Sequence, residues 1–256
     1  MPEGDTIHNA ANRLRPVLAG RVPDASETPQ RRHALERWPE RLAGRRIESV
    51  DAHGKHLFLR FEGDLVLHSH LGMSGSWVVR DGAKRRPAGR AWIVLRAGAR
   101  EVVQFAGPTL ELLTALRART DPRLATLGPD IIGEHFDEQA VVYRLRQAEP
   151  SRSIGEALLD QGAVAGIGNI WKSESCFAAG VDPWRLVAET DAAELLEILR
   201  FAREQMGVSA RDGFTARPRA VYRRAGEPCW RCSAPVRSAG QGDQNRTTYW
   251  CPACQR

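Results

Sequence analysis

Four cysteines near the end of the chain form two close pairs. Cys229 pairs with Cys232 and Cys251 with Cys254, each across two intervening residues. Two such pairs about 18 residues apart have the spacing of a zinc ribbon, in which four thiolates complete a closed tetrahedron. We therefore expect one structural Zn²⁺ per chain, with two disulfides or a redox dithiol as the alternative.

A second reactive group lies at the start of the chain. Once Met1 is removed, Pro2 presents a secondary amine, and an α-amine with an ordinary pKa of about 8 keeps a usable neutral fraction at neutral pH. Secondary amines form iminium ions with aldehydic carbons. Glu3 places a carboxyl beside the amine as an acid or base. Taken alone, Met-Pro has a simpler explanation, which is that proline permits removal of the methionine.

The elements that would position these groups fall into two halves. A helix with apolar residues at helical spacing runs from Ile7 to Leu18 and can end at Gly20. Six short segments rich in β-branched and aromatic residues follow, separated in several places by Gly and Asp, and they predict an antiparallel sandwich or barrel. The predicted strands are Ile47–Val50, His56–Phe61, Leu65–His68, Trp77–Arg80, Ala91–Leu95 and Val102–Phe105.

Helical patterns dominate from about Pro108 onward. Gly128-Pro129-Asp130 supplies turn residues and is a candidate linker. The predicted helices are Leu110–Leu116, Glu138–Gln147, Ile154–Gln161, Ile170–Ala178 and Ala192–Arg203.

The composition favours a nucleic-acid partner. The 256 residues carry 37 Lys and Arg against 31 Asp and Glu, a net charge of +6. Excess positive charge suits binding to phosphates, and 42 % hydrophobic residues argue against long disorder. The polar, acidic residues 1–5 differ from a secretory signal, and no apolar run reaches the roughly 18 to 20 residues that span a bilayer. We expect no membrane contact and a cytoplasmic location.

Five motifs occur in an order typical of one family. They are MPEG at 1–4, GKHL at 54–57, HLGMSG at 70–75, LDQ at 159–161 with GIGNI at 166–170, and GEPC at 226–229 leading to Cys254. In this order they resemble the formamidopyrimidine-DNA glycosylase / endonuclease VIII family over essentially the whole chain. The resemblance implies an α+β fold with an N-terminal helix and antiparallel β-sandwich (1–118), a helix–two-turn–helix domain (128–222) and a C-terminal zinc ribbon (223–256).

The resemblance also implies catalytic roles. Pro2 would attack C1′ of the damaged nucleotide, Glu3 would shuttle protons, and Lys55 would contact a phosphate near the lesion. From the residues alone, a solvated surface lysine is the favoured explanation of Lys55.

Four further positions match DNA-binding residues of the family. They are His70, Asn169 and Arg246 as phosphate contacts and Met73 as the apolar wedge that fills the gap left by a flipped base. Each has a plainer alternative: a core histidine, a helix N-cap, a solvated hairpin arginine and a core methionine. Glu174 matches a glutamate that braces the site in the family, although a solvated carboxylate on a helix face is an alternative.

Three departures from the family pattern point to the endonuclease VIII side. Thr6 stands where the family usually has a carboxylate, residues 104–109 contain no arginine, and the loop at 212–218 is short. Met73 resembles the other branch. The resemblance thus implies a monomeric DNA glycosylase/AP lyase of the bacterial cytoplasm, associated with the nucleoid. Oxidised bases in damaged duplex DNA are its expected substrates, with pyrimidines as the expected class, and it is expected to nick the strand by β,δ-elimination. A damage-binding protein without catalysis and a zinc-ribbon RNA-associated factor remain the alternatives.

Overall fold

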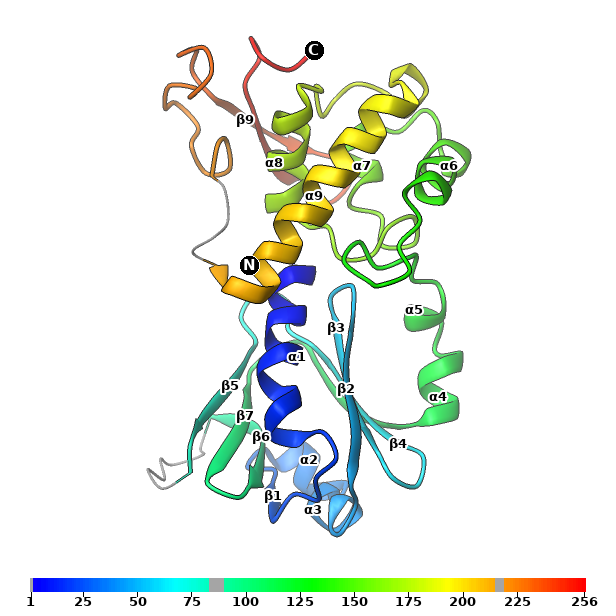
Figure 1. The fold of residues 1–256 in the computed structure, drawn as a ribbon, viewed down its shortest axis with the longest axis vertical. Helices are drawn as coiled ribbons and strands as arrows, with labels where there is room; N and C mark the ends of the chain where they lie inside the picture. The colour runs from blue at the N-terminus through cyan, green and yellow to red at the C-terminus, as the bar shows by residue number, and fades with distance from the viewer. Residues whose placement is uncertain (1, 83–89, 215–218) are drawn as a thin grey trace. The chain divides into compact units, whose positions relative to one another are not determined.

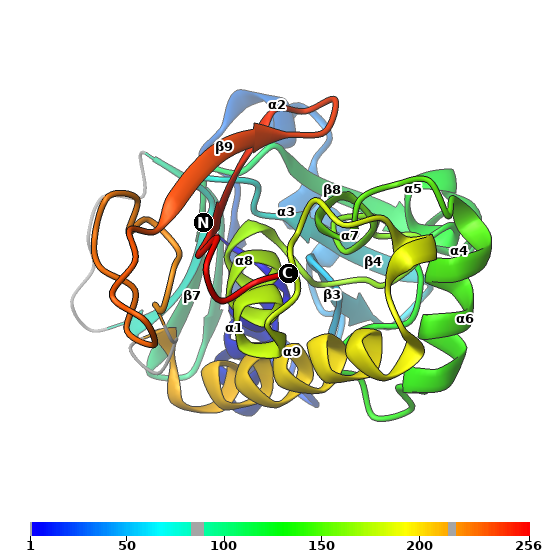
Figure 2. The ribbon, with the colours of Figure 1, turned by 90° about the horizontal axis from the view of Figure 1, so that it is seen from above.

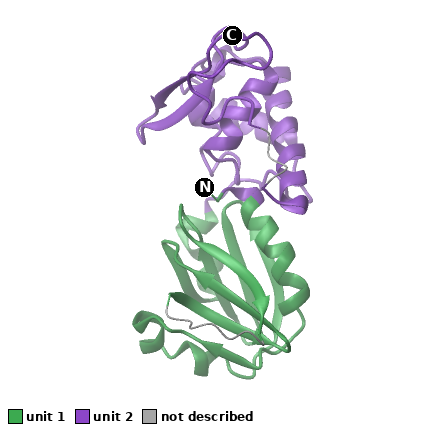
Figure 3. Cartoon of the chain, turned by 90° about the vertical axis from the view of Figure 1, so that its left-hand side faces the viewer, with its two compact units in different colours: residues 1–2, 6–125 green, residues 3–5, 126–256 purple. Residues whose placement is uncertain are grey.

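The computed structural model describes residues 2–82, 90–214 and 219–256 and forms two compact units (Figure 3). The first unit comprises residues 1–2 and 6–125, and the second comprises residues 3–5 and 126–256. Residues 215–218 of the predicted short loop lie outside the described residues. The division into three domains stays a prediction.

The first unit contains two four-stranded antiparallel sheets and a long N-terminal helix (Figure 1). One sheet has the order β1-β6-β7-β5 and the other β2-β3-β4-β8. The helices are α1 (Gly4–Leu18), α2 (Arg31–Leu35), α3 (Trp38–Leu42), α4 (Ala115–Thr120) and α5 (Pro122–Ala125). The strands are β1 (Ala25–Glu27), β2 (Ile47–His53), β3 (His56–Phe61), β4 (Leu65–His70), β5 (Ser76–Asp81), β6 (Ala91–Ala97), β7 (Arg100–Phe105) and β8 (Thr109–Thr114).

Apolar side chains from α1 and from both sheets share one core. Leu14 and Leu18 of α1 lie in the same buried cluster as Leu67 of β4 and Leu95 of β6. The helix therefore presents its apolar stripe to the sandwich, as its residue spacing predicted. The predicted α+β class is confirmed.

The helix predicted at Leu110–Leu116 is wrong. This segment begins as β8, which pairs with β4, and only then turns into α4. Leu110 and Leu112 are buried while Glu111 between them is partly exposed, so the segment alternates with the period of a strand. The run of leucines suited either structure, and pairing with β4 decided it.

The second unit is a group of helices with a C-terminal hairpin. Its elements are α6 (Glu138–Ala148), α7 (Ile154–Ala157), α8 (Asn169–Ala179), the 3₁₀ turn η1 (Val187–Glu189), α9 (Ala192–Asp212), β9 (Arg237–Gln241) and β10 (Arg246–Trp250). Helices α8 and α9 lie side by side, and the hairpin contacts α8 (Figure 2). The predicted helix at 154–161 stops at Ala157, and the one predicted to stop at Arg203 continues to Asp212.

The loop between α7 and α8 is ordered by one side chain. Gln161 Oε1 accepts the N–H of Gly166 at 3.0 Å, and its Nε2 donates to the carbonyl of Ile167 at 3.0 Å. The predicted linker residue Gly128 donates its N–H to the Gln161 carbonyl and so belongs to this unit. None of the helices in the described ranges is long and apolar enough to cross a membrane.

Candidate active site and metal centre

The Glu3 carboxylate lies at the N-terminus of α8. It accepts N–H bonds from Gly168 at 3.1 Å, Ile170 at 2.8 Å and Trp171 at 3.3 Å, and Glu3 is fully buried. The first N–H groups of a helix lack partners within the helix and carry its positive dipole end, so a carboxylate is stabilised there. The residue after the candidate nucleophile is therefore fixed in position by helix-end hydrogen bonds.

Glycines make this close approach possible. A Cβ on Gly168 would lie 2.3 Å from Glu3 Cδ, and one on Gly4 would lie 2.8 Å from Gly166 Cα. The Gly4 N–H also donates to the Gly166 carbonyl at 2.9 Å. Residues 3–4 thus pack closely against residues 166–168, which explains the glycines at positions 4 and 168.

A carboxylate is buried nearby although Thr6 replaces the usual acid. Asp5 is fully buried and accepts a hydrogen bond from Ser209 Oγ of α9 at 2.5 Å. The chain therefore carries a carboxylate one residue earlier than the family pattern has it. Pro2 is half-buried and precedes α1.

The predicted phosphate-binding residues of the first unit lie where β3 begins and β4 ends in the β2-β3-β4-β8 sheet. Lys55 lies in the turn between β2 and β3, and His70 is the last residue of β4. His56, the residue after Lys55, pairs with His70 across β3 and β4, so Lys55 and His70 are neighbours at this end of the sheet. His70 Nδ1 accepts the N–H of Gly72 at 3.3 Å. His70 is half-buried, which disagrees with a core histidine.

Met73 lies on the loop after β4 with 73 % of its surface exposed. An unbranched apolar side chain this exposed is not part of the core, so the alternative of a core methionine is wrong. The tight loop that carries it is closed by the Gly75 N–H, which donates to the Leu71 carbonyl at 2.8 Å. Its exposure suits a side chain that contacts a partner.

Asn169 and Arg246 are brought together in the second unit. Asn169 is the first residue of α8 and is buried, and its Nδ2 donates to the Thr247 carbonyl of β10 at 2.6 Å. Gly168 is the N-cap and Glu3 supplies the capping oxygens, so a plain capping role for Asn169 is wrong. Arg246 is exposed at the start of β10, where Gln244 Oε1 accepts from its Nε and Nη2 at 3.1 and 3.0 Å.

Sequence reasoning missed Lys172, which links α8 to the hairpin. Its ammonium is fully buried and donates to Thr248 Oγ1 and, at 3.4 Å, to Gln241 Oε1. Burial lowers the pKa of Lys172 to about 8, and the charge of Arg246 acts in the same direction. Every residue from 169 to 177 is buried, whether polar or apolar. The sequence of α8 therefore has no exposed polar face that would separate a buried lysine from a solvated one.

Glu174 is a buried bracing residue rather than a solvated one. It is 1 % exposed and accepts the N–H groups of Ala220 at 2.8 Å, Val221 at 3.1 Å and Tyr222 at 2.8 Å. Burial raises the pKa of this carboxyl against the opposing effect of the three amides. Glu174 thus anchors the segment after residue 218 to α8.

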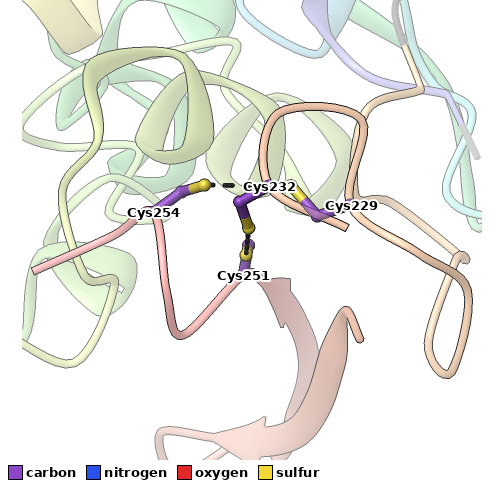
Figure 4. Close-up of side chains that lie close together, drawn as sticks. All are labelled: Cys229, Cys232, Cys251 and Cys254. Carbon is purple, nitrogen blue, oxygen red and sulfur yellow. Dashed lines mark hydrogen bonds between the residues drawn. The ribbon is translucent and has the colours of Figure 1, made fainter. Parts of the chain in front are cut away.

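The four cysteines near the C-terminus gather at one point (Figure 4). Their sulfurs lie within 4.8 Å of one another, with Cys229 and Cys254 at 3.9 Å and Cys232 and Cys251 at 3.5 Å. Ligand sulfurs about 2.3 Å from a tetrahedral zinc lie roughly 3.8 Å apart, so the set fits such an ion. Cys229 and Cys251 are buried beside Phe177 of α8, which attaches the site to the helices.

Comparisons with known proteins agree with this geometry. Residues 1–109 match the formamidopyrimidine-DNA glycosylase N-terminal domain, and residues 127–216 match the formamidopyrimidine-DNA glycosylase H2TH domain. A probable endonuclease 8 2 of Streptomyces coelicolor is 42 % identical over the whole chain and 94 % of its own length. A Mycolicibacterium smegmatis protein named DNA-(apurinic or apyrimidinic site) lyase Nei2 is 36 % identical over the whole chain and 99 % of its own length.

A solved structure shares the fold. Lactococcus lactis formamidopyrimidine DNA glycosylase, non-covalently bound to DNA containing an AP site, superposes with a TM-score of 0.84 at 23 % identity. The alignment covers 99 % of each chain.

Proposed function

Because the chain belongs to the formamidopyrimidine-DNA glycosylase and endonuclease VIII family of DNA glycosylases and AP lyases, we propose that Pro2 is its nucleophile and Glu3 its proton shuttle. The observation that carries this proposal is the Glu3 carboxylate held by three amides at the start of α8. A side chain held this way fixes the backbone next to Pro2. Such positioning is a large part of enzymatic rate enhancement.

The reaction follows from the amine. The Pro2 nitrogen forms a bond to C1′, the bond from C1′ to the base breaks, and the departing base receives a proton. The C1′–O4′ bond then breaks as O4′ takes up a proton, which opens the sugar and leaves an iminium at C1′. The iminium acidifies the C2′ protons, so loss of one of them expels the 3′ phosphate. A second elimination expels the 5′ phosphate, and hydrolysis of the iminium releases Pro2. Glu3 carries protons in these steps.

Five residues form the proposed grip on damaged duplex DNA. Lys55, His70, Asn169 and Arg246 contact phosphates, and Met73 enters the stack beside the flipped nucleotide. The exposure of Met73 and Arg246 supports this assignment.

The cysteine cluster supports a structural zinc ion in this proposal. Cys229, Cys232, Cys251 and Cys254 would be its four ligands, and a closed thiolate set leaves no position for chemistry. The metal would stabilise the hairpin that carries Arg246, because so small a segment has little core of its own.

Oxidised pyrimidines are the proposed lesions. The absence of arginine in residues 104–109 and the endonuclease 8 names of several relatives favour this branch. We propose a monomer acting in the bacterial cytoplasm at the nucleoid, since the relatives named above are bacterial.

Strand cleavage tests the proposal against binding without catalysis. A labelled duplex with one abasic site, and matched duplexes with an oxidised pyrimidine or an oxidised purine, are incubated with wild-type protein and with the Pro2→Gly and Glu3→Gln variants. We expect the wild type to cut the abasic and pyrimidine-lesion strands and to leave phosphate at both ends of a one-nucleotide gap. Tight binding of the abasic duplex with no cleavage would instead establish a damage-binding protein.

A further inference from the structure

Two histidines and a glutamate form a chain along the outer face of the β2-β3-β4-β8 sheet. His56 Nδ1 lies 2.8 Å from His68 Nε2, and His68 Nδ1 lies 3.6 Å from Glu111 Oε2. His68 is 1 % exposed, and its Nδ1 is a buried nitrogen without a hydrogen-bond partner in the described part of the chain. No role was predicted for His56 or His68.

The position of each proton follows from the glutamate. Arg123 donates to Glu111 Oε1 at 3.3 Å and to Oε2 at 2.9 Å. Burial raises the pKa of Glu111, but the hydrogen bonds and charge of Arg123 outweigh it and lower the pKa overall. Glu111 is the polar group that faces His68 Nδ1, and its ionised carboxylate can only accept, so we assign the proton of neutral His68 to Nδ1. His68 Nε2 then accepts from His56 Nδ1, which leaves His56 Nε2 without a proton.

The neighbouring His70 has the opposite tautomer. Its Nδ1 accepts the N–H of Gly72, so the proton of neutral His70 is on Nε2. Neutral His70 can therefore donate to a phosphate oxygen, whereas neutral His56 offers the same oxygen only a lone pair. The two imidazoles are cross-strand neighbours with ring centroids 4.8 Å apart.

Lowered pKa values favour the neutral form of all three imidazoles in the DNA-free protein at neutral pH. Burial lowers the pKa of His56 to about 3, and the positive charge of Lys55 acts in the same direction, as would protonation of the neighbouring His70, His68 or His53. The pKa values of His68 and His70 are also lowered, first by burial. The negative charge of a phosphate beside Lys55 would act in the opposite direction and raise the pKa of His56. Glu111 is the carboxylate that faces the histidines from β8.

We propose that His56 is a further phosphate-binding residue, which takes up a proton on Nε2 when DNA binds beside Lys55 and His70. The protonated ring of His56 donates from Nε2 to the phosphate and from Nδ1 to His68 Nε2. The Nδ1–H of His68 in turn faces the Glu111 carboxylate. His68 and Glu111 are positioning residues that fix the tautomer of His56. This inference rests on the proposed function, in which DNA binds beside Lys55 and His70.

Calorimetry measures how many protons the complex takes up when DNA binds. Wild-type protein is titrated with a duplex containing a non-cleavable abasic analogue, in two buffers of different ionisation enthalpy, between pH 8 and pH 6. We expect proton uptake that grows as the pH falls. His56→Gln keeps a neutral hydrogen-bond donor but cannot take up a proton. As the pH falls through the range in which bound His56 titrates, the DNA affinity of wild type should therefore rise relative to that of the variant, by up to tenfold per pH unit.

Matched variants assign the proton to one residue. His135→Gln removes an exposed histidine of the second unit and should leave the uptake unchanged. Uptake that survives in His56→Gln, or that disappears only in His70→Gln, would overturn the proposal. If wild-type protein binds and cuts DNA with no proton uptake, the histidine proposal alone fails; if it does not bind the duplex, the proposed function fails as well.

Nitrogen NMR of the wild-type imidazoles tests the proposal without any variant, so misfolding cannot affect the result. We expect His56 to carry its proton on Nδ1 and His70 on Nε2 without DNA, and both nitrogens of His56 to be protonated in the complex at pH 6. A His56 proton on Nε2 in the free protein would contradict the chain.

Discussion

Replacing Gly168 by alanine tests whether the contact between Glu3 and α8 supports catalysis. Gly168 has φ −123° and ψ −165°, an extended conformation that alanine adopts without strain. The cost therefore comes from the new Cβ, which would lie 2.3 Å from Glu3 Cδ and 2.6 Å from Oε1. Since Glu3 is fully buried, its carboxylate must leave at least part of its set of three amides.

The size of the effect follows from those hydrogen bonds. A hydrogen bond to a charged group contributes about 1.5 to 3 kcal/mol, and the three are not additive. We expect Gly168→Ala to lower the free energy of unfolding by about 2 to 4 kcal/mol. A shift of about 1 Å in the chain beside the nucleophile should slow abasic-strand cleavage roughly a hundredfold.

Gly207→Ala is the matched control. Gly207 lies inside α9, and a Cβ there would meet only Arg211 Nη1, at 3.5 Å. Alanine should stabilise this helix by about 0.5 to 1 kcal/mol and leave cleavage unchanged. Urea denaturation and single-turnover cleavage are measured for both variants. A Gly168→Ala protein as stable and as fast as wild type would refute the account of Glu3.

Three further predictions concern other parts of the molecule. The pKa of Lys172 is lowered from 10.5 to about 8, so between these pH values the unfolded chain binds more protons than the folded one. The free energy of unfolding of wild type, relative to that of Lys172→Met, should therefore rise as the pH is raised from 8 to 10. Urea titrations that show no such rise would contradict the burial of its charge. A chelator should release one zinc per chain, measured by a colorimetric metal assay, and weaken DNA binding; Cys232→Ser should hold the ion less tightly, whereas metal-free protein with unchanged stability would exclude a structural role. Met73→Ala should change the free energy of unfolding by less than about 0.5 kcal/mol, because the side chain is 73 % exposed, yet weaken binding of an abasic-analogue duplex at least tenfold; equal binding in a fluorescence titration would remove the wedge role.

The sequence predicted those parts of the fold that have a clear period or a fixed spacing. The apolar stripe of α1, the alternating strands of the sandwich and the two cysteine pairs each depend on residues close together in the chain. The helix at 110–116 failed because its leucines fit both periods and a strand distant in sequence determined the outcome.

The candidate site was predicted as a set of residues but not as a set of contacts. Glu3 was expected to act on protons, and its place at the end of α8 depends on a contact across more than 160 positions of chain. Lys172 and Glu174 lie on a helix that is buried on every side, so no surface pattern marks them. The tautomers of His56 and His68 depend on Glu111, which is two strands away from His56 in the sheet.

The attacking atom can be identified by one measurement on wild-type protein. The enzyme is mixed with abasic duplex and borohydride, which reduces an iminium to a stable covalent adduct, and the cross-linked peptide is sequenced by mass spectrometry. The account predicts chains that begin at Pro2 with the sugar attached to the Pro2 nitrogen. A sugar attached to a lysine, or full-rate cleavage by protein that retains Met1 throughout, would contradict it.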